Sequence, residues 1–181
     1  MSIVGSDVKP LKIYLDMCCY NRPYDDQSQL KIFLETQSKL HIQALIRDKK
    51  LKLITSYMLR YECSNNPFEM RRNTILDFIR ENTYAYVGDE RKMLIEAKAA
   101  EIMQTGVKFK DACHVASAVY AKCEYFISTD KRLLKYKSEA IKMVSPIEFI
   151  IEMEETLYDG KHDWNYEQGD EMFDAASGKY R

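Results

Sequence analysis

The sequence contains little that would suit a membrane, a secretion pathway or a flexible chain. It has no uncharged apolar run of about 18 residues, the length that a membrane-spanning helix needs. Its opening residues lack the apolar segment and small-residue cleavage site of a secretion signal. Six Gly and four Pro among 181 residues leave little material for long linkers. We therefore expect one soluble domain of ordinary size that stays in the cytoplasm.

Cysteine is also too sparse to indicate a zinc site. The chain has five cysteines, an odd number, and no C-x-x-C pair. We expect these side chains to be free buried thiols that pack as small hydrophobes.

The charge of the chain is balanced overall but divided unevenly. The formal net charge is −1, yet residues 152–181 contain nine acidic and three basic side chains, so residues 1–151 carry a net +5. We expect a mildly basic domain over 1–151 and an acidic helix end and tail over 152–181. A basic body of this kind permits a polyanionic partner.

Short apolar runs alternate with segments of helical periodicity along the chain. Strands are predicted at 12–15, 51–55, 85–87, 125–127 and 143–144. Helices are predicted over 30–46, from 57, over 68–80, 90–104, 110–122 and 132–136, and from Pro146. This order predicts an α/β three-layer sandwich with a central, mainly parallel sheet flanked by helices.

Two aspartates directly follow predicted strands. Asp16 ends the run Ile13-Tyr14-Leu15, and Asp130 ends Tyr125-Phe126-Ile127-Ser128-Thr129. The carboxyl ends of parallel strands meet at one edge of the sheet, so both side chains are expected there. Crowded carboxylates repel unless one is protonated or a cation enters, and Mg²⁺ or Mn²⁺ favours such oxygen ligands. Capping of the segments that follow is the alternative role for each.

Two further acids are harder to place from the pattern alone. Glu62 lies on the helix that Ser56 is expected to cap, and Asp111 lies in the first turn of another helix. A solvated helix charge is the ordinary role for Glu62. For Asp111 it is stabilisation of the helix dipole, worth about 0.3–1 kcal/mol.

Four motifs in order resemble those of PIN-domain nucleases, a family that includes VapC-like ribonuclease toxins. They are Ile13-Tyr14-Leu15-Asp16 followed by Asn21, Thr55-Ser56-Tyr57-Met58-Leu59-Arg60-Tyr61-Glu62, Lys110-Asp111-Ala112-Cys113-His114-Val115-Ala116-Ser117-Ala118, and Tyr125-Phe126-Ile127-Ser128-Thr129-Asp130. The resemblance covers about residues 12–151. One departure is Met17, where many family members carry a hydroxyl side chain.

The resemblance implies a PIN-like fold and a metal-dependent ribonuclease. Asp16, Glu62, Asp111 and Asp130 would then bind one or two Mg²⁺ or Mn²⁺ ions and catalyse hydrolysis of RNA phosphodiester bonds, with Asp130 acting directly or through water. Asn21, Thr129 and His114 would support these ligands or orient the substrate. For His114, a core position bonded to a carbonyl is the ordinary alternative. An antitoxin protein and a homodimer are the partners that the resemblance implies.

Basic residues lie close in sequence to two of the acids. Lys108, Lys110, Lys131 and Arg132, with Lys135 and Lys137 beyond them, are placed to hold an RNA backbone. A solvated surface is the alternative for this run. The acidic tail over 159–181 would compete with RNA for the same surface, or lie free.

Three other functions are weighed against the nuclease. The first is a catalytically inactive PIN-like module that binds RNA or a protein. The second is a phosphatase of the haloacid dehalogenase type, which needs an acid two residues after Asp16, where this chain has Cys18. A response-regulator receiver is disfavoured because the acidic pair near the first strand is absent.

Overall fold

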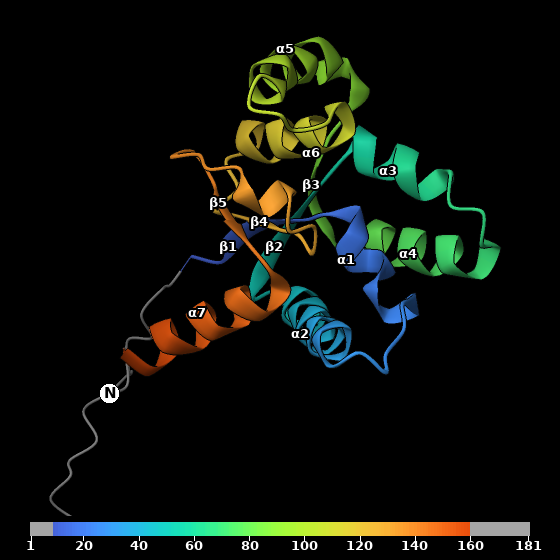
Figure 1. The fold of residues 1–181 in the computed structure, drawn as a ribbon, viewed down its shortest axis with the longest axis vertical. Helices are drawn as coiled ribbons and strands as arrows, with labels where there is room; N and C mark the ends of the chain where they lie inside the picture. Colours follow the sequence, from blue (N-terminus) through green and yellow to red (C-terminus); the bar gives the residue numbers. More distant parts are fainter. Residues whose placement is uncertain (1–8, 160–181) are drawn as a thin grey trace, which may run out of the picture. The chain divides into compact units, whose positions relative to one another are not determined.

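The described part of the chain, residues 9–159 of a computed structural model, is built from alternating strands and helices (Figure 1). The strands are β1 (Leu11–Leu15), β2 (Leu51–Ser56), β3 (Thr83–Val87), β4 (Tyr125–Ile127) and β5 (Lys142–Val144). The α-helices are α1 (Met17–Asn21), α2 (Leu30–Arg47), α3 (Tyr57–Ser64), α4 (Glu69–Asn82), α5 (Lys92–Met103), α6 (Phe109–Tyr120) and α7 (Pro146–Asp159). Single 3₁₀ turns occur at η1 (Arg22–Tyr24), η2 (Asp89–Arg91) and η3 (Leu133–Lys135).

The strands form one parallel sheet in the order β3-β2-β1-β4-β5. Strand β1 is therefore central, and Ile13, Tyr14 and Leu15 have no exposed surface. An apolar run without polar alternation is what a strand covered on both faces requires. The predicted fold class, a parallel sheet flanked by helices, is confirmed.

Helices cover the sheet on both sides. Figure 1 shows α6 on one side with α5 beyond it, and α2 on the other side. Helix α6 is buried at every position from Ala112 to Ala118, because it lies between the sheet and α5. Its small Ala, Cys and Ser side chains permit this close packing.

The strand register brings two chain segments to the same edge of the sheet. Leu15 is paired with Ile127, so Asp16 and Ser128 leave their strands at the same level. The Asp16 backbone N–H donates to the Ile127 carbonyl at 2.9 Å and continues the ladder by one bond. Behind them, the ring of Tyr14 stacks on Phe126 with centroids 5.4 Å apart. This packing fixes the edge where the acids were expected.

Two segments differ from the sequence prediction in detail. The turn predicted at 21–23 is preceded by helix α1, which forms because the Asp16 side chain accepts a hydrogen bond from the Met17 N–H. The helix predicted over 132–136 is the 3₁₀ turn η3, and Tyr136 after it is already extended. Both segments are too short for their periodicity to define the helix type.

The chain divides into two compact units after Ile150, and α7 continues across that point. The domain boundary predicted after residue 151 stays a prediction, and the acidic segment 160–181 lies outside the described residues. No helix within residues 9–159 is both long and apolar enough to cross a membrane.

Candidate functional site

Asp16 and Asp130 are connected through the hydroxyl of Ser128. Ser128 Oγ donates to Asp16 Oδ2 at 2.7 Å and accepts from the Asp130 backbone N–H at 3.0 Å. Asp16 is 5% exposed, and Ser128 is fully buried. The hydroxyl that Met17 lacks is thus supplied to Asp16 by a residue from a neighbouring strand end.

Both aspartates also serve as local caps. Asp16 Oδ1 accepts from the Met17 N–H at 2.8 Å, and Asp130 Oδ1 accepts from the Arg132 N–H at 2.7 Å. Each cap uses Oδ1. Asp16 Oδ2 is bonded to Ser128 and to the Cys18 thiol, whereas no described residue hydrogen-bonds Asp130 Oδ2. The capping alternative therefore describes part of what these side chains do and leaves Asp130 an available oxygen.

Glu62 is oriented by a histidine from another helix. His114 Nε2 lies 2.8 Å from Glu62 Oε2, and Lys110 Nζ lies 3.8 Å from Oε1. The Glu62 side chain is 22% exposed, whereas His114 is fully buried. The expected carbonyl partner of His114 is replaced here by this carboxylate, because α3 and α6 pack side by side.

The histidine belongs to a buried chain of hydrogen bonds that begins in the sheet. Tyr14 Oη lies 2.7 Å from His114 Nδ1 and 2.6 Å from Ser56 Oγ. The carboxylate of Glu62 can only accept, so Nε2 carries the proton and donates. Tyr14 Oη thus links the imidazole ring to the Ser56 hydroxyl, and either side can supply its donor. Burial raises the pKa of Tyr14 well above its ordinary value, which keeps its donor proton in place.

Asp111 has the opposite electrostatic setting from Glu62. Burial, together with the negative charges of Asp16, Asp130 and Glu62, raises the pKa of Asp111 above 3.8, and His114 opposes this only in part. For Glu62, burial raises the pKa, but the hydrogen bond and charge of His114 and the charge of Lys110 outweigh it and hold the pKa below 4.5. Asp111 is thus the acid at which the charges of the other three converge.

The predicted supporting residues are distributed unequally around this group. Thr129 is buried, and its backbone N–H donates to Cys18 Sγ, which in turn lies 3.1 Å from Asp16 Oδ2. Asn21 lines a shallow hollow with Thr129 and Asp130, and its side-chain oxygen accepts from Asn66. Neither Asn21 nor the Thr129 hydroxyl makes a hydrogen bond to one of the four acids among the described residues.

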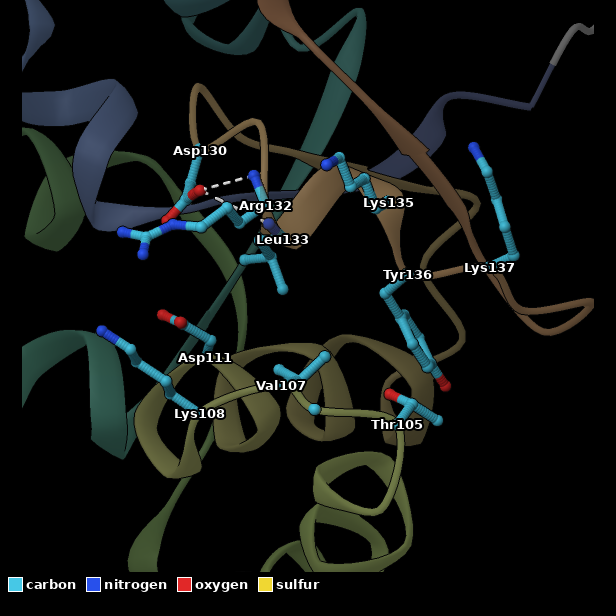
Figure 2. Close-up of a pocket in the computed structure, with 11 residues that line it drawn as sticks. Thr105, Val107, Lys108, Asp111, Asp130, Arg132, Leu133, Lys135, Tyr136 and Lys137 are labelled. Atoms are coloured by element: carbon cyan, nitrogen blue, oxygen red, sulfur yellow. Dashed lines mark hydrogen bonds between the residues drawn. The ribbon is translucent and has the colours of Figure 1, made fainter.

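The predicted RNA-binding residues are all exposed, and they lie in three places. Lys108 and Arg132 line a pocket of about 410 Å³ that also contains Asp111 and Asp130 (Figure 2). Lys131 lines the hollow beside Asn21, and Lys110 faces Glu62. Only Lys110 of these four is engaged with a described carboxylate.

Carboxylate oxygens are the donors that a hard divalent cation prefers, so the residue types fit Mg²⁺ or Mn²⁺. The charge crowding at Asp111 also fits, because a cation would relieve it. In the arrangement described for residues 9–159, however, no three His, Cys, Asp or Glu side chains surround one point closely enough to hold a metal ion. Metal binding by the four acids stays a prediction.

Sequence reasoning did not identify Ser128, Tyr14 or Ser56 as parts of this site. Ser128 stands two residues before Asp130, in the position where a strand ends, and that position was the available signal. For Tyr14 and Ser56 no local signal exists, because each is an ordinary residue of an apolar strand or a helix cap.

No family model and no curated protein matches the chain. Among solved structures, VapBC2 from Rickettsia felis, bound to a DNA fragment from its promoter, is similar at 11% identity and a TM-score of 0.47, over 75% of this chain and 98% of that one. FitAcB from Neisseria gonorrhoeae has 14% identity and a TM-score of 0.44, over 74% and 97%. FitAB bound to an IR36 DNA fragment has 16% identity and a TM-score of 0.47, over 75% and 95%. At these identities no side-chain role carries over.

Proposed function

We propose that this chain is a metal-dependent endoribonuclease with a PIN-like site. The observation that supports this most is the convergence of charge on Asp111, whose pKa is raised by burial and by the charges of Asp16, Asp130 and Glu62. Maintaining four carboxylates at one sheet edge costs stability unless a cation is bound there. The order of the four motifs that resemble the PIN family supports the same function.

The residues have separable roles in this proposal. Asp16, Glu62 and Asp111 would hold one or two Mg²⁺ or Mn²⁺ ions, and Asp130 would contribute through its available Oδ2 or through water. Such ions lower the pKa of bound water and offset charge that develops on a phosphodiester. Ser128 and His114 fix the direction of two of the carboxylates, as supporting hydrogen bonds do in metal sites.

The basic residues complete the substrate side of the proposal. Lys108 and Arg132 line the pocket that contains Asp111 and Asp130, so they are placed to neutralise backbone phosphates next to the acids. Lys110 directly precedes Asp111 in the first turn of α6, and its Nζ lies 3.8 Å from Glu62 Oε1. A polyanion that approaches the acids would therefore meet positive charge before it meets the carboxylates.

Cleavage of a labelled RNA with Mg²⁺ or Mn²⁺ tests this function. The wild type is expected to cleave, EDTA to abolish cleavage, and Asp16→Asn to reduce the rate by at least about a hundredfold, as expected for loss of several kcal/mol of metal-assisted stabilisation. Asp77→Asn is the matched control, because Asp77 is an exposed acid on α4 paired only with Arg80. Equal cleavage by wild type and Asp16→Asn, purified in parallel, would contradict the proposal.

An inactive PIN-like module is the second candidate, and one observation favours it. Asp16, Glu62 and Asp130 all have protein partners in a structure where no metal-holding group of side chains is formed among residues 9–159. A ligand that binds only the folded state raises the thermal midpoint. No rise with millimolar Mn²⁺, together with no cleavage, would favour this candidate over the nuclease.

The resemblance to the PIN family also leads us to propose a toxin role with an antitoxin protein as partner. Expression of the wild type in a bacterial host is then expected to stop growth, and expression of Asp16→Asn is not. A short reading frame next to the gene whose product restores growth on co-expression would support the antitoxin partner. Normal growth with well-expressed, nuclease-active wild type would contradict the toxin role.

A further inference from the structure

The pocket beside Asp111 and Asp130 contains more than an acidic site needs. Its lining comes from the loop between α5 and α6, the first turn of α6, and the segment around η3. Figure 2 shows the two acids at one side, Tyr136 with Thr105 at the other, and Val107 and Leu133 between them. The acids thus occupy one end of a pocket that has an apolar middle and a tyrosine at its other end.

Four basic side chains gather at this pocket without a close ion pair. Lys108, Arg132, Lys135 and Lys137 all line it, and none forms a salt bridge with a carboxylate in the described part of the chain. Exposed cations elsewhere, such as Lys31, Lys92 and Lys98, do pair with acids on their own helices. The charge of Lys137 contributes to the lowered pKa of Glu148, but no carboxylate lies within salt-bridge distance of any of the four in the described residues. Four cations around one pocket favour an anionic ligand with more than one charge.

The floor of the pocket favours a flat, partly apolar group. Leu133 is 3% exposed and Tyr136 is half-buried, and both line the pocket, so part of the Tyr136 side chain stays accessible from it. The loop of residues 105–108 reaches the pocket because Gly106 turns the chain at φ 96°, in the left-handed region. A ligand carrying phosphate alone would not use this surface, and an apolar ligand would not use the cations.

We propose that this pocket receives one unpaired base of a single-stranded RNA, stacked on Tyr136, while the adjoining phosphate lies at Lys108 and Arg132, beside Asp111 and Asp130. That the ligand is RNA rests on the proposed function. A volume of about 410 Å³ lies at the lower end of the range of about 300–1,000 Å³ for small-molecule pockets, so one nucleotide fits it better than several. A base within a duplex is inaccessible unless it is flipped out, so the pocket selects unpaired strands.

Lys135 and Lys137 lie beyond Leu133 in the chain, toward Tyr136, whereas Lys108 and Arg132 lie toward the acids (Figure 2). The cations therefore flank both ends of the base position. They would contact the phosphates on the two sides of the stacked nucleotide, and they would do so for any sequence. Stacking on an aromatic ring likewise tolerates all four bases. The pocket thus accounts for selection of unpaired RNA and not for selection of a sequence.

Metal-free binding of a short labelled RNA tests this pocket independently of cleavage. We would measure fluorescence anisotropy in EDTA with an eight-nucleotide single strand, with the same strand carrying one abasic site at each position in turn, and with its duplex. Tyr136→Ala is expected to weaken binding of the intact strand about tenfold, within the range for loss of one base-aromatic stack. Tyr136→Phe keeps the ring and should bind like wild type.

Two controls separate stacking from damage to the fold. Tyr136→Leu keeps apolar bulk without the ring, and it should show the same loss as Tyr136→Ala even if the alanine variant is unstable. Tyr120→Ala removes an exposed tyrosine at the end of α6, away from the pocket, and should bind like wild type. One abasic position should weaken binding to the wild type about tenfold and leave binding to Tyr136→Leu unchanged.

The proposal is overturned if Tyr136→Leu binds the intact strand as tightly as wild type does. It is overturned as well if every abasic site weakens binding to the wild type and to Tyr136→Leu by the same factor. It is also overturned if the duplex shows the same dependence on Tyr136 as the single strand. Failure of the nuclease is a different result: the wild type would then not cleave RNA with Mg²⁺ or Mn²⁺, while the metal-free anisotropy would still show the dependence on Tyr136.

Discussion

The two pairs of acids at this sheet edge are fixed in different ways. Asp16 and Asp130 follow strands, cap the segments after them, and are joined by one hydroxyl from Ser128. Glu62 is oriented by His114, which is in turn bonded to Tyr14 in the core. Asp111 has no hydrogen bond from a described side chain, and the charges of the neighbouring acids oppose its ionisation. The strand pair is thus set by bonds at the strand ends, and the helix pair by long-range packing.

The difference predicts where the site is most sensitive to mutation. Asp16 can keep its other hydrogen bonds when the Ser128 hydroxyl is lost, because it also accepts from the Met17 N–H and the Cys18 thiol. A buried chain of hydrogen bonds has no such alternative, because each removed group leaves another polar atom without a partner. Mutation of a single core residue should therefore destabilise the helix pair, Glu62 and Asp111, more than it destabilises the strand pair, Asp16 and Asp130.

The largest effect is expected for His114→Ala. The variant removes a fully buried ring and leaves Tyr14 Oη and Glu62 Oε2 without a common partner. The free energy of unfolding at pH 7 should fall by roughly 2–4 kcal/mol, which combines a cavity with lost buried hydrogen bonds. Urea unfolding measures it. His41→Ala on the exposed face of α2 is the control and should change stability by less than about 0.5 kcal/mol.

A smaller loss is expected for Ser128→Ala. Its hydroxyl serves Asp16 Oδ2 and the Asp130 N–H, so the free energy of unfolding should fall by about 1–2 kcal/mol. Ser117→Ala is a matched control, because Ser117 is equally buried but donates only to the Cys113 carbonyl of its own helix. If Ser128→Ala costs as much as His114→Ala, the contrast between the two pairs is wrong.

The pH dependence should separate the two members of the helix pair. The folded pKa of Glu62 is lowered, so its stabilisation is fully present above the unfolded pKa, near 4.5, and is lost as the pH falls through the folded pKa. Glu62→Gln should therefore lower the thermal midpoint at pH 7, and this effect should shrink as the pH falls below 4.5. Thermal unfolding across this range measures the difference between variant and wild type.

Asp111→Asn should show the opposite sign without metal. The folded pKa of Asp111 is raised, so its charged form opposes folding above that pKa, and the penalty disappears as the pH falls toward 3.8. The variant should gain less than about 1 kcal/mol at pH 7, since the site is partly open to solvent. A loss of stability at pH 7 in EDTA would contradict the crowding of charge at Asp111.

The smallest effect is expected for Lys110→Ala. Its Nζ lies 3.8 Å from Glu62 Oε1 with the lysine side chain 56% exposed, so the pair should contribute no more than about 0.5 kcal/mol and should weaken with salt. Lys98→Ala, which removes an exposed pair with Glu101, is the control and should behave alike. A loss above about 1 kcal/mol would show that Lys110 helps to position Glu62.

Much of the fold followed from local pattern. The apolar runs at β1 and β4, each followed by an acid, predicted both the parallel sheet and the edge at which Asp16 and Asp130 meet. Period-two and period-3.6 patterns are short-range properties, so the sequence contains them directly. The exact form of the short segments α1 and η3 was missed, because a single turn has no periodicity to read.

The sequence by itself determined most of the elements that form and that two acids follow strands of one parallel sheet. Only the tertiary structure decided that Ser128 joins those acids and that His114 orients Glu62. It also decided that Asp111 lies within the electrostatic influence of the other three acids. It also decided that Tyr136, from a segment far along the chain from Val107, closes the same pocket. The physical reason is that these contacts join residues tens of positions apart, and their distances depend on strand register and helix packing, which no local pattern specifies.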